Sequence, residues 1–182
     1  MLRVIAGKYR GQRLRLPDQK TTRPMRDAVK EALFSIISEW LPGSVVLDAF
    51  AGSGSLAIEA LSRGASKAIA LEKDARAFQV LQENAEKIGV RNFDFYLRDA
   101  LNYVSLVSGV RFDLIFLDPP YQKVDLLNEI LKAIIKNNLL NSQGLIVVQT
   151  NELDLVNVPK QLVKWKVKRY QKTSLLFLTY NL

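Results

Sequence analysis

The sequence of 182 residues contains no cysteine and no histidine. Without cysteine the chain has no disulfide, thiolate nucleophile or iron–sulfur ligand, and without histidine it has no imidazole base and no Ser-His-Asp triad. Metal sites built from these two residue types are excluded as well, and we expect no metal. An enzyme with this composition must use carboxylates, lysine, tyrosine, backbone groups or a reactive cofactor.

Long apolar runs are also missing. No stretch reaches about 18 uninterrupted apolar residues, so we expect no transmembrane helix and no membrane partner. The first residues carry charges but no apolar core, which is unlike a signal peptide, and we expect a cytoplasmic location. The length and a hydrophobic content of 48% are typical of one soluble globular domain. Nothing in the pattern requires more than a monomer.

Acidic residues are too few to balance the basic ones, because 18 Asp and Glu stand against 26 Lys and Arg, a net charge of +8. Residues 1–30 hold nine basic and two acidic residues, a local charge of +7, and residues 160–172 hold six basic residues and no acid, a charge of +6. The remaining residues carry eleven basic and sixteen acidic side chains, a charge of −5. Either run could be a solvated face, but two runs around an acidic body favour one anionic partner.

Hydrophobic periodicity predicts an α/β fold. Two short alternating runs, 3–6 and 12–16, predict an N-terminal β-hairpin, and helical spacing predicts an amphipathic helix over 24–40. The expected core strands are 45–49, 67–72, 92–97, 112–117 and 144–150, the expected helices are 55–63, 75–88, a short one from 100, and 124–137, and the expected closing hairpin is 164–170 with 174–180. This alternation predicts a Rossmann-like, seven-stranded, mostly parallel sheet covered on both faces.

A glycine turn follows the first core strand, in the segment Asp48-Ala49-Phe50-Ala51-Gly52-Ser53-Gly54. At the carboxyl end of a parallel strand, such a turn lets backbone N–H groups approach a ligand at the start of the next helix. The spacing also suits a dinucleotide, whose ribose would be bound by Glu72, 20 residues after Gly52. A purely structural turn is the third interpretation.

Three acidic residues, Asp48, Glu72 and Asp99, each end or follow one of three consecutive strands. Asp48 would repel a pyrophosphate and attract a cationic amino-acid group. Glu72 can accept ribose hydroxyls, and Asp99 can accept an adenine amino group. Each acid alone could be a surface residue or a helix cap, but together they fit S-adenosylmethionine (SAM) better than a phosphate-bearing cofactor.

The tetrapeptide Asp118-Pro119-Pro120-Tyr121 follows the strand expected beside the glycine turn. Two successive prolines rigidify the loop and restrict the residue before each of them. The loop can therefore present the Asp118 carboxylate, the Pro119 carbonyl and the Tyr121 ring to one planar substrate. An Asp-Pro pair alone is usually an ordinary turn, so the full tetrapeptide and its position carry the prediction.

The tetrapeptide is similar to the motif of SAM-dependent amino-methyltransferases, which methylate exocyclic or amide nitrogens. Four further segments resemble the RsmD family, bacterial enzymes that methylate N2 of one guanine in 16S ribosomal RNA. They are RVIAGKYRG (3–11), Thr22-Arg23-Pro24, EALFSII (31–37) and VVLDAFAGSGSLAIEALSRGA (45–65). The resemblance covers nearly the whole chain. It implies a class I SAM-dependent methyltransferase fold and one catalytic domain, 1–182, with a basic extension (1–41) and a SAM-binding core (42–182).

The resemblance also implies roles for the matching residues. The cofactor would be held by Asp48, Phe50, Ala51, Gly52, Gly54, Glu72, Lys73, Asp99 and Ala100, and the target base by Asp118, Pro119, Pro120 and Tyr121. The basic ends would hold RNA phosphates, through Lys8, Arg10, Arg13, Arg15, Arg23, Arg26, Lys166, Lys168 and Arg169. The expected partner is 16S ribosomal RNA, within the small ribosomal subunit or an assembly intermediate.

Other interpretations stay open from the sequence. A DNA adenine-N6 or cytosine-N4 amino-methyltransferase shares the chemistry but usually carries a larger target-recognition region. A protein glutamine methyltransferase generally has asparagine in place of Asp118. A nicotinamide dehydrogenase would explain the glycines and Glu72, but not Asp48 or the segment 118–121. A non-catalytic RNA-binding domain would explain the basic ends, but not the acids clustered at the strand ends.

Overall fold

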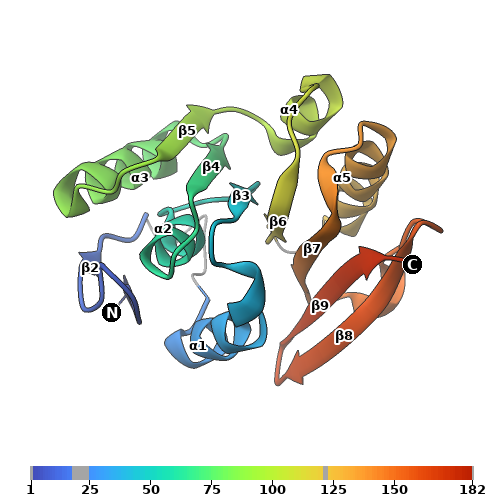
Figure 1. Ribbon diagram of the computed structural model, residues 1–182, viewed down its shortest axis with the longest axis horizontal. Helices are drawn as coiled ribbons and strands as arrows, with labels where there is room; N and C mark the ends of the chain where they lie inside the picture. The colour runs from blue at the N-terminus through green and yellow to red at the C-terminus, as the bar shows by residue number, and fades with distance from the viewer. Residues whose placement is uncertain (1, 18–24, 121–122, 182) are drawn as a thin grey trace.

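The protein forms a seven-stranded sheet with helices on both faces (Figure 1). The computed structural model describes residues 2–17, 25–120 and 123–181. The strand order is β5-β4-β3-β6-β7-β9-β8, formed by β3 (Val45–Asp48), β4 (Lys67–Glu72), β5 (Phe93–Leu97), β6 (Phe112–Leu117), β7 (Leu140–Thr150), β8 (Leu162–Tyr170) and β9 (Thr173–Tyr180). All neighbours are parallel except β9, which pairs antiparallel with β7 and β8. The expected mostly parallel sheet is confirmed.

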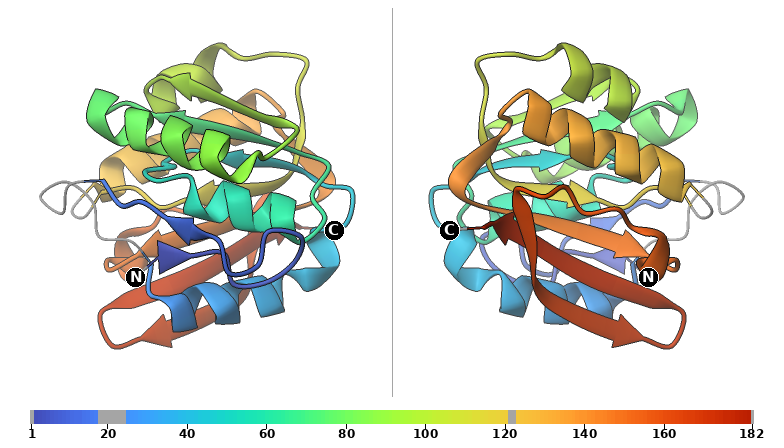
Figure 2. Two further views of the ribbon diagram at one scale, coloured as in Figure 1. Left: turned by 90° about the vertical axis from the view of Figure 1, so that its left-hand side faces the viewer. Right: turned by 90° about the vertical axis from the view of Figure 1, so that its right-hand side faces the viewer.

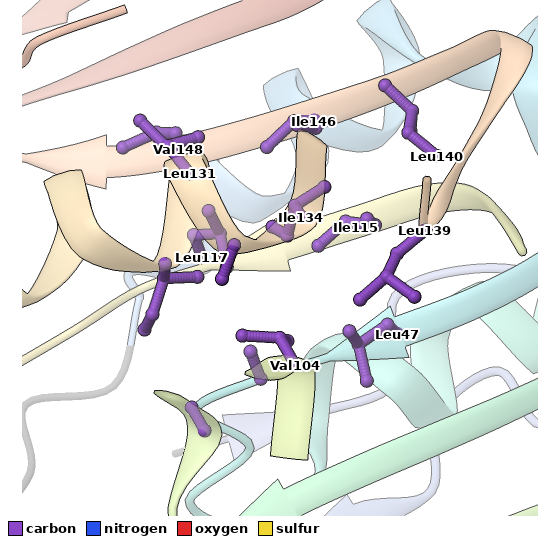
Figure 3. Packing of buried hydrophobic residues seen from close by; sticks show 14 of the residues in the cluster. Leu47, Val104, Ile115, Leu117, Leu131, Ile134, Leu139, Leu140, Ile146 and Val148 are labelled. Carbon is purple, nitrogen blue, oxygen red and sulfur yellow. The ribbon is translucent and has the colours of Figure 1, made fainter. Parts of the chain in front are cut away.

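Helices cover the sheet in two layers. They are α1 (Asp27–Ile36), α2 (Ser55–Ser62), α3 (Ala75–Ile88), α4 (Ala100–Leu106) and α5 (Val124–Lys136), with short 3₁₀ helices η1 (Ser38–Trp40) and η2 (Leu153–Leu155). Alternate residues of the buried strands face opposite layers, as the pleat requires. Figure 3 shows one layer, where apolar side chains of β3, β6 and β7 meet α4 and α5, including Leu47, Val104, Ile115, Leu131 and Ile146. The other layer packs under α1, α2 and part of α3.

The strand order reverses between β3 and β6. The chain enters the sheet at β3, builds outward through β4 and β5, and then returns to β6 on the other side of β3. Open α/β sheets bind ligands at such a switch point, outside the carboxyl ends of the strands. Because β7 and β8 both run antiparallel to β9, the carboxyl end of β8 lies at this same edge.

The N-terminal extension packs on the outside of α2 (Figure 2, left). Its hairpin is shorter than the sequence predicts, since only β1 (Leu2–Arg3) and β2 (Arg13–Leu14) pair. Apolar contact secures it, in a cluster of Leu2, Val4, Leu14 and Ile58. The helix expected over 24–40 is confirmed over 27–36, ending in η1, and Thr22-Arg23-Pro24 lies outside the described residues.

A buried ion pair joins the extension to the core. Lys30 on α1 and Glu59 on α2 have no exposed side-chain surface, and Lys30 Nζ lies 3.2 Å from the Glu59 carboxylate. The same ammonium donates to the Arg3 carbonyl (2.7 Å) and the Ser55 hydroxyl (3.0 Å). Glu59 in turn accepts the backbone N–H groups of Ile5 and Ala6, at 2.8 and 3.0 Å. Two fully buried charges thus fix where the N-terminal segment lies.

Gly7 is required where the extension touches the end of α2. Its φ is +84°, and a Cβ there would overlap the Ser62 carbonyl group, which accepts the Lys8 N–H at 2.8 Å. Gly11 has a similar φ of +81°, but among the described residues no heavy atom beyond Gly11 and its two chain neighbours lies within 4 Å of the position that a Cβ would take there. We expect Gly11→Ala to cost about 1–2 kcal/mol of unfolding free energy from left-handed strain alone, and Gly7→Ala at least twice that. Urea unfolding measures both, and equal losses would contradict the close contact.

No helix among residues 2–17, 25–120 and 123–181 combines the length and apolar character needed to cross a bilayer. Within the same residues, no group of three or more acidic side chains is placed to hold a metal ion.

Candidate active site

A cavity of about 350 Å³ lies at the carboxyl ends of β3, β4 and β6. Six of the nine predicted cofactor residues line it, namely Phe50, Ala51, Gly52, Glu72, Lys73 and Ala100. Asp118, Pro119 and Pro120 line it from the other side. The structure therefore brings the glycine turn and the Asp-Pro-Pro loop to one cavity, while Tyr121 lies outside the described residues.

Backbone N–H groups of the glycine turn are already paired inside the protein. Gly52 donates to the Glu72 carboxylate (2.9 Å), and Gly54 donates to the Ala51 carbonyl (2.7 Å). Ala57, in the first turn of α2, donates to Asp48 (3.3 Å). A pyrophosphate would need such groups free and would meet carboxylates instead. This arrangement disfavours the dinucleotide interpretation.

Glu72 is held in place by the backbone and keeps acceptor capacity. One carboxylate oxygen accepts the N–H groups of Lys73 and Asp74, both at 2.8 Å, and among the described residues the other accepts only that of Gly52. A carboxylate has about four lone-pair positions, so one remains for a ligand hydroxyl. Its placement on the cavity wall suits a ribose.

Asp48 is a buried carboxyl group directly before the lining residues Ala49 and Phe50. Burial, and to a smaller degree the charge of Glu72, raises the pKa of Asp48 to about 7, although backbone hydrogen bonds from Ala57 and Phe50 act against the increase. Its Oδ1 atom has no hydrogen-bond partner among the described residues. A buried, under-paired carboxyl beside a cavity suits a cationic ligand group, which would restore its charge.

Asp118 is the second carboxyl group with a raised pKa. Burial and the nearby charge of Asp48 raise its pKa to about 7, although part of its surface remains open to the cavity. Asp48 and Asp118 therefore repel one another in their ionised forms. Carboxyl groups with raised pKa values at and beside a cavity are typical of catalytic and ligand sites.

Stability should consequently fall with rising pH. An unfolded aspartate has a pKa of about 3.9. Between roughly pH 4 and 7 the folded protein therefore binds more protons than the unfolded chain, and the free energy of unfolding decreases as pH rises. We expect Asp118→Asn to reduce the loss between pH 5 and pH 8, measured by urea unfolding. Asp125→Asn, which removes an exposed carboxyl on α5, is the matched control and should keep the full loss. The same loss in both variants would contradict the assignment.

Asp99 occupies a less direct position. It is exposed and caps α4 by accepting the N–H of Asn102 at 3.0 Å. Its neighbours Arg98 and Ala100 line the cavity, but Asp99 does not. Its contact with an adenine stays a prediction.

Comparison with known proteins places the chain in a family. A family model described as conserved hypothetical protein 95 matches residues 2–179. Ribosomal RNA small subunit methyltransferase D from Buchnera aphidicola is 33% identical over 175 residues, which cover 95% of this chain and 87% of that protein. The Escherichia coli protein of the same name is 33% identical over 169 residues, covering 92% and 83%. The chain belongs to the RsmD family.

Solved structures agree with this RsmD family membership. A putative methyltransferase from Escherichia coli, yhhF, superimposes with a TM-score of 0.89 at 29% identity, covering 100% of this chain and 98% of that one. A putative methylase from Haemophilus influenzae, HI0767, gives a TM-score of 0.84 at 30% identity, covering 98% of each. A putative methyltransferase complexed with SAH matches at 0.68 and 13% identity, a likeness in fold alone. The Rossmann-like methyltransferase fold is thus confirmed.

The predicted RNA-binding residues of this RsmD family member lie in three separate places. Lys8 and Arg10 lie in the turn that contacts Ser62, at the far end of α2 from the glycine turn. Arg15 and Arg26 adjoin lining residues Leu16 and Met25. Exposed positions on β2 and β8 hold Arg13, Lys166, Lys168 and Arg169, while Arg23 lies outside the described residues. Thus only part of the basic set lies near the cavity.

Several lining residues are absent from the predicted site, among them Leu16, Pro17 and Gln149. Leu16 and Pro17 reach the cavity from the extension, and Gln149 reaches it from the end of β7. Nothing in the local pattern of residues 16–17 indicates this contact, because it depends on how the extension packs. Gln149 does carry a signal, since it ends the apolar run 145–148 as Asp48 and Asp118 end theirs.

Proposed function

We propose that this RsmD family member uses SAM to methylate the exocyclic N2 amine of a specific guanine in 16S ribosomal RNA of the small subunit. The observation that carries the proposal is the single cavity shared by the acidic glycine turn and the Asp118-Pro119-Pro120 loop. The names of its relatives, ribosomal RNA small subunit methyltransferase D, support ribosomal RNA as the substrate class.

The charge and the lining of the cavity support SAM as the cofactor. Asp48 would face the cationic methionine end, Glu72 the ribose hydroxyls, and apolar side chains such as Leu71 the adenine ring. When bound, SAM supplies a methyl group on a positively charged sulfur. The protein needs no histidine or cysteine for such a transfer, which agrees with its composition.

The Asp118 carboxylate and the Pro119 carbonyl would each accept a hydrogen bond from one N–H group of the guanine amine. The lone pair of that nitrogen is delocalised into the ring, so two acceptors favour the tetrahedral geometry that makes it nucleophilic. In its carboxylate form, Asp118 can also take up the proton that the amine loses. The Tyr121 ring would stack on the base. Placement of this kind can lower the activation free energy by about 7–11 kcal/mol.

The target base must leave its stack to reach the loop, at a cost of a few kcal/mol. Basic side chains near the cavity would hold the surrounding phosphates and offset that cost. The C-terminal hairpin lies on the same edge, since Thr173 at the start of β9 shares a hollow with Asp118.

Transfer of a tritiated methyl group from labelled SAM tests the proposal. Small subunits lacking the modification, naked 16S RNA and genomic DNA are each offered, and the products are digested to nucleosides. We expect label in N2-methylguanosine from subunits or RNA. Label only in N6-methyladenine or N4-methylcytosine of DNA would favour the rival amino-methyltransferase, and no label would contradict both.

Phosphate contacts should differ between basic residues at the cavity edge of the sheet and those away from it. We expect Arg169→Ala, beside the β8–β9 turn, to weaken RNA binding and to lower the slope of log K against log salt by about one. Lys8→Ala should have a smaller effect because it lies at the far end of α2. Lys132→Ala, exposed on α5, is the matched control. Equal effects of all three on binding would contradict the placement.

A further inference from the structure

We propose that Gln149 recognises the Watson–Crick edge of the target guanine, accepting a hydrogen bond from N1–H and donating one to O6. The inference rests on the proposed function and names the residue that would make the reaction selective for guanine. It is carried by the position of Gln149, by its unpaired amide oxygen and by the hydrogen-bonding pattern of the base.

Gln149 borders the Asp-Pro-Pro loop from a neighbouring strand. Strands β6 and β7 lie side by side (Figure 1). Leu117 of β6 pairs with Val148 of β7, so Asp118, directly after β6, and Gln149, near the end of β7, lie at the same level. A second hollow of about 20 Å³ lies against the loop, toward the end of β7 and the start of β9. Asp118, Pro119, Pro120 and Gln149 line both this hollow and the main cavity. Gln149 is the one of the four that comes from outside the loop.

The amide oxygen of Gln149 is buried and has no hydrogen-bond partner among the described residues. Buried side-chain oxygens in folded proteins almost always have a partner, so an unpaired one calls for an explanation. The two nearest hydroxyls make other contacts: Thr173 Oγ1 donates to the Thr150 carbonyl at 3.5 Å, and Thr150 Oγ1 accepts the Glu152 N–H at 3.0 Å. A donor from a bound base would satisfy this oxygen.

Guanine offers the matching pattern along one edge. Its 2-amine, N1–H and O6 follow one another, as two donor positions and then an acceptor. With the 2-amine held by Asp118 and the Pro119 carbonyl, the remaining donor and acceptor extend away from the loop. A glutamine amide presents an acceptor and a donor side by side, and its terminal torsion is broad enough to turn toward either hollow. Gln149 therefore complements the part of the edge that the loop leaves unpaired.

The base 2,6-diaminopurine distinguishes recognition through hydrogen bonds from Gln149 from recognition of the shape of the purine. It keeps the 2-amine but has an acceptor at N1 and a donor at position 6, which reverses the pattern that Gln149 would contact. We expect the wild-type protein to favour guanine over 2,6-diaminopurine by at least about tenfold in kcat/KM, because unpaired buried polar groups are costly to a site built around them.

The test compares guanine and 2,6-diaminopurine at the methylated position of the RNA, which is first located by mapping the tritium label to ribonuclease fragments. Gln149→Met should lower kcat/KM on guanine by about tenfold or more and bring the ratio between the bases close to one, with SAM affinity and unfolding midpoint unchanged. Gln161→Met, which replaces an exposed glutamine, is the control, and Gln149→Leu serves if the methionine variant is unstable. A retained preference in a folded Gln149 variant overturns the inference alone. Absence of N2-methylguanosine with the wild-type protein overturns the proposed function and the inference with it.

Discussion

Asp118→Asn is expected to lower kcat for methyl transfer by about 10²–10⁴-fold while SAM affinity stays within about twofold. Asparagine has nearly the same shape but cannot take up a proton, and its amide group can present donors where the guanine amine needs acceptors. Asp118 lines the cavity on the side of the Asp-Pro-Pro loop and not on the side of the glycine turn, so the variant should still bind SAM. Single-turnover transfer gives the rate, and calorimetry gives the affinity for SAM.

Asp125→Asn, at an exposed carboxyl on α5, provides the matched control and should retain wild-type rates. Unchanged kcat in Asp118→Asn would remove Asp118 from the reaction. If SAM affinity fell instead and kcat at saturation did not, Asp118 would belong to the cofactor site.

Glu59→Leu is expected to cost roughly 3–5 kcal/mol of unfolding free energy. The substitution leaves Lys30 as a buried ammonium without its carboxylate and also removes the acceptor of the Ile5 and Ala6 N–H groups. Burial already lowers the pKa of Lys30, while the charge of Glu59 and its hydrogen bond oppose that decrease. Lys30→Met should cost less, because Glu59 keeps those two N–H groups and the guanidinium of Arg63.

Chemical denaturation measures these losses, and the double variant Lys30→Met/Glu59→Leu should lose less than the sum of the single losses. The surface pair Lys67–Asp94, with both side chains exposed and 2.7 Å apart, supplies a control. Exposed pairs contribute little, so Asp94→Leu should change stability far less than Glu59→Leu. Similar losses in the two variants would mean that the buried pair does not anchor the extension.

Most of the core follows from local pattern. Strands 67–72 and 112–117 and helix 75–88 begin and end where their apolar periodicity does. β7 instead starts at residue 140, before the polar stretch 141–143. It does so because its pairing with β6 continues past a register shift, which the local sequence pattern does not indicate. The burial of Lys30 could not be predicted from the local pattern either, since its partner Glu59 comes from another helix.

The acidic half of the site was predictable and the basic half only in part. Asp48, Glu72 and Asp118 gather because the carboxyl ends of parallel strands share one edge of the sheet, a geometric consequence of the fold. The basic runs have no such constraint, so the course of the extension carries Lys8 away from the cavity. The position of Gln149 at the cavity depends on β7 being the strand that lies beside β6, and the sheet order supplies this information.

The central claim, methylation of guanine N2 in 16S ribosomal RNA, is tested most directly in cells that lack this protein. Mass spectrometry of their 16S RNA should show one N2-methylguanosine missing, restored by the wild-type gene but not by Asp118→Asn. An unchanged complement of N2-methylguanosine in those cells would contradict the account.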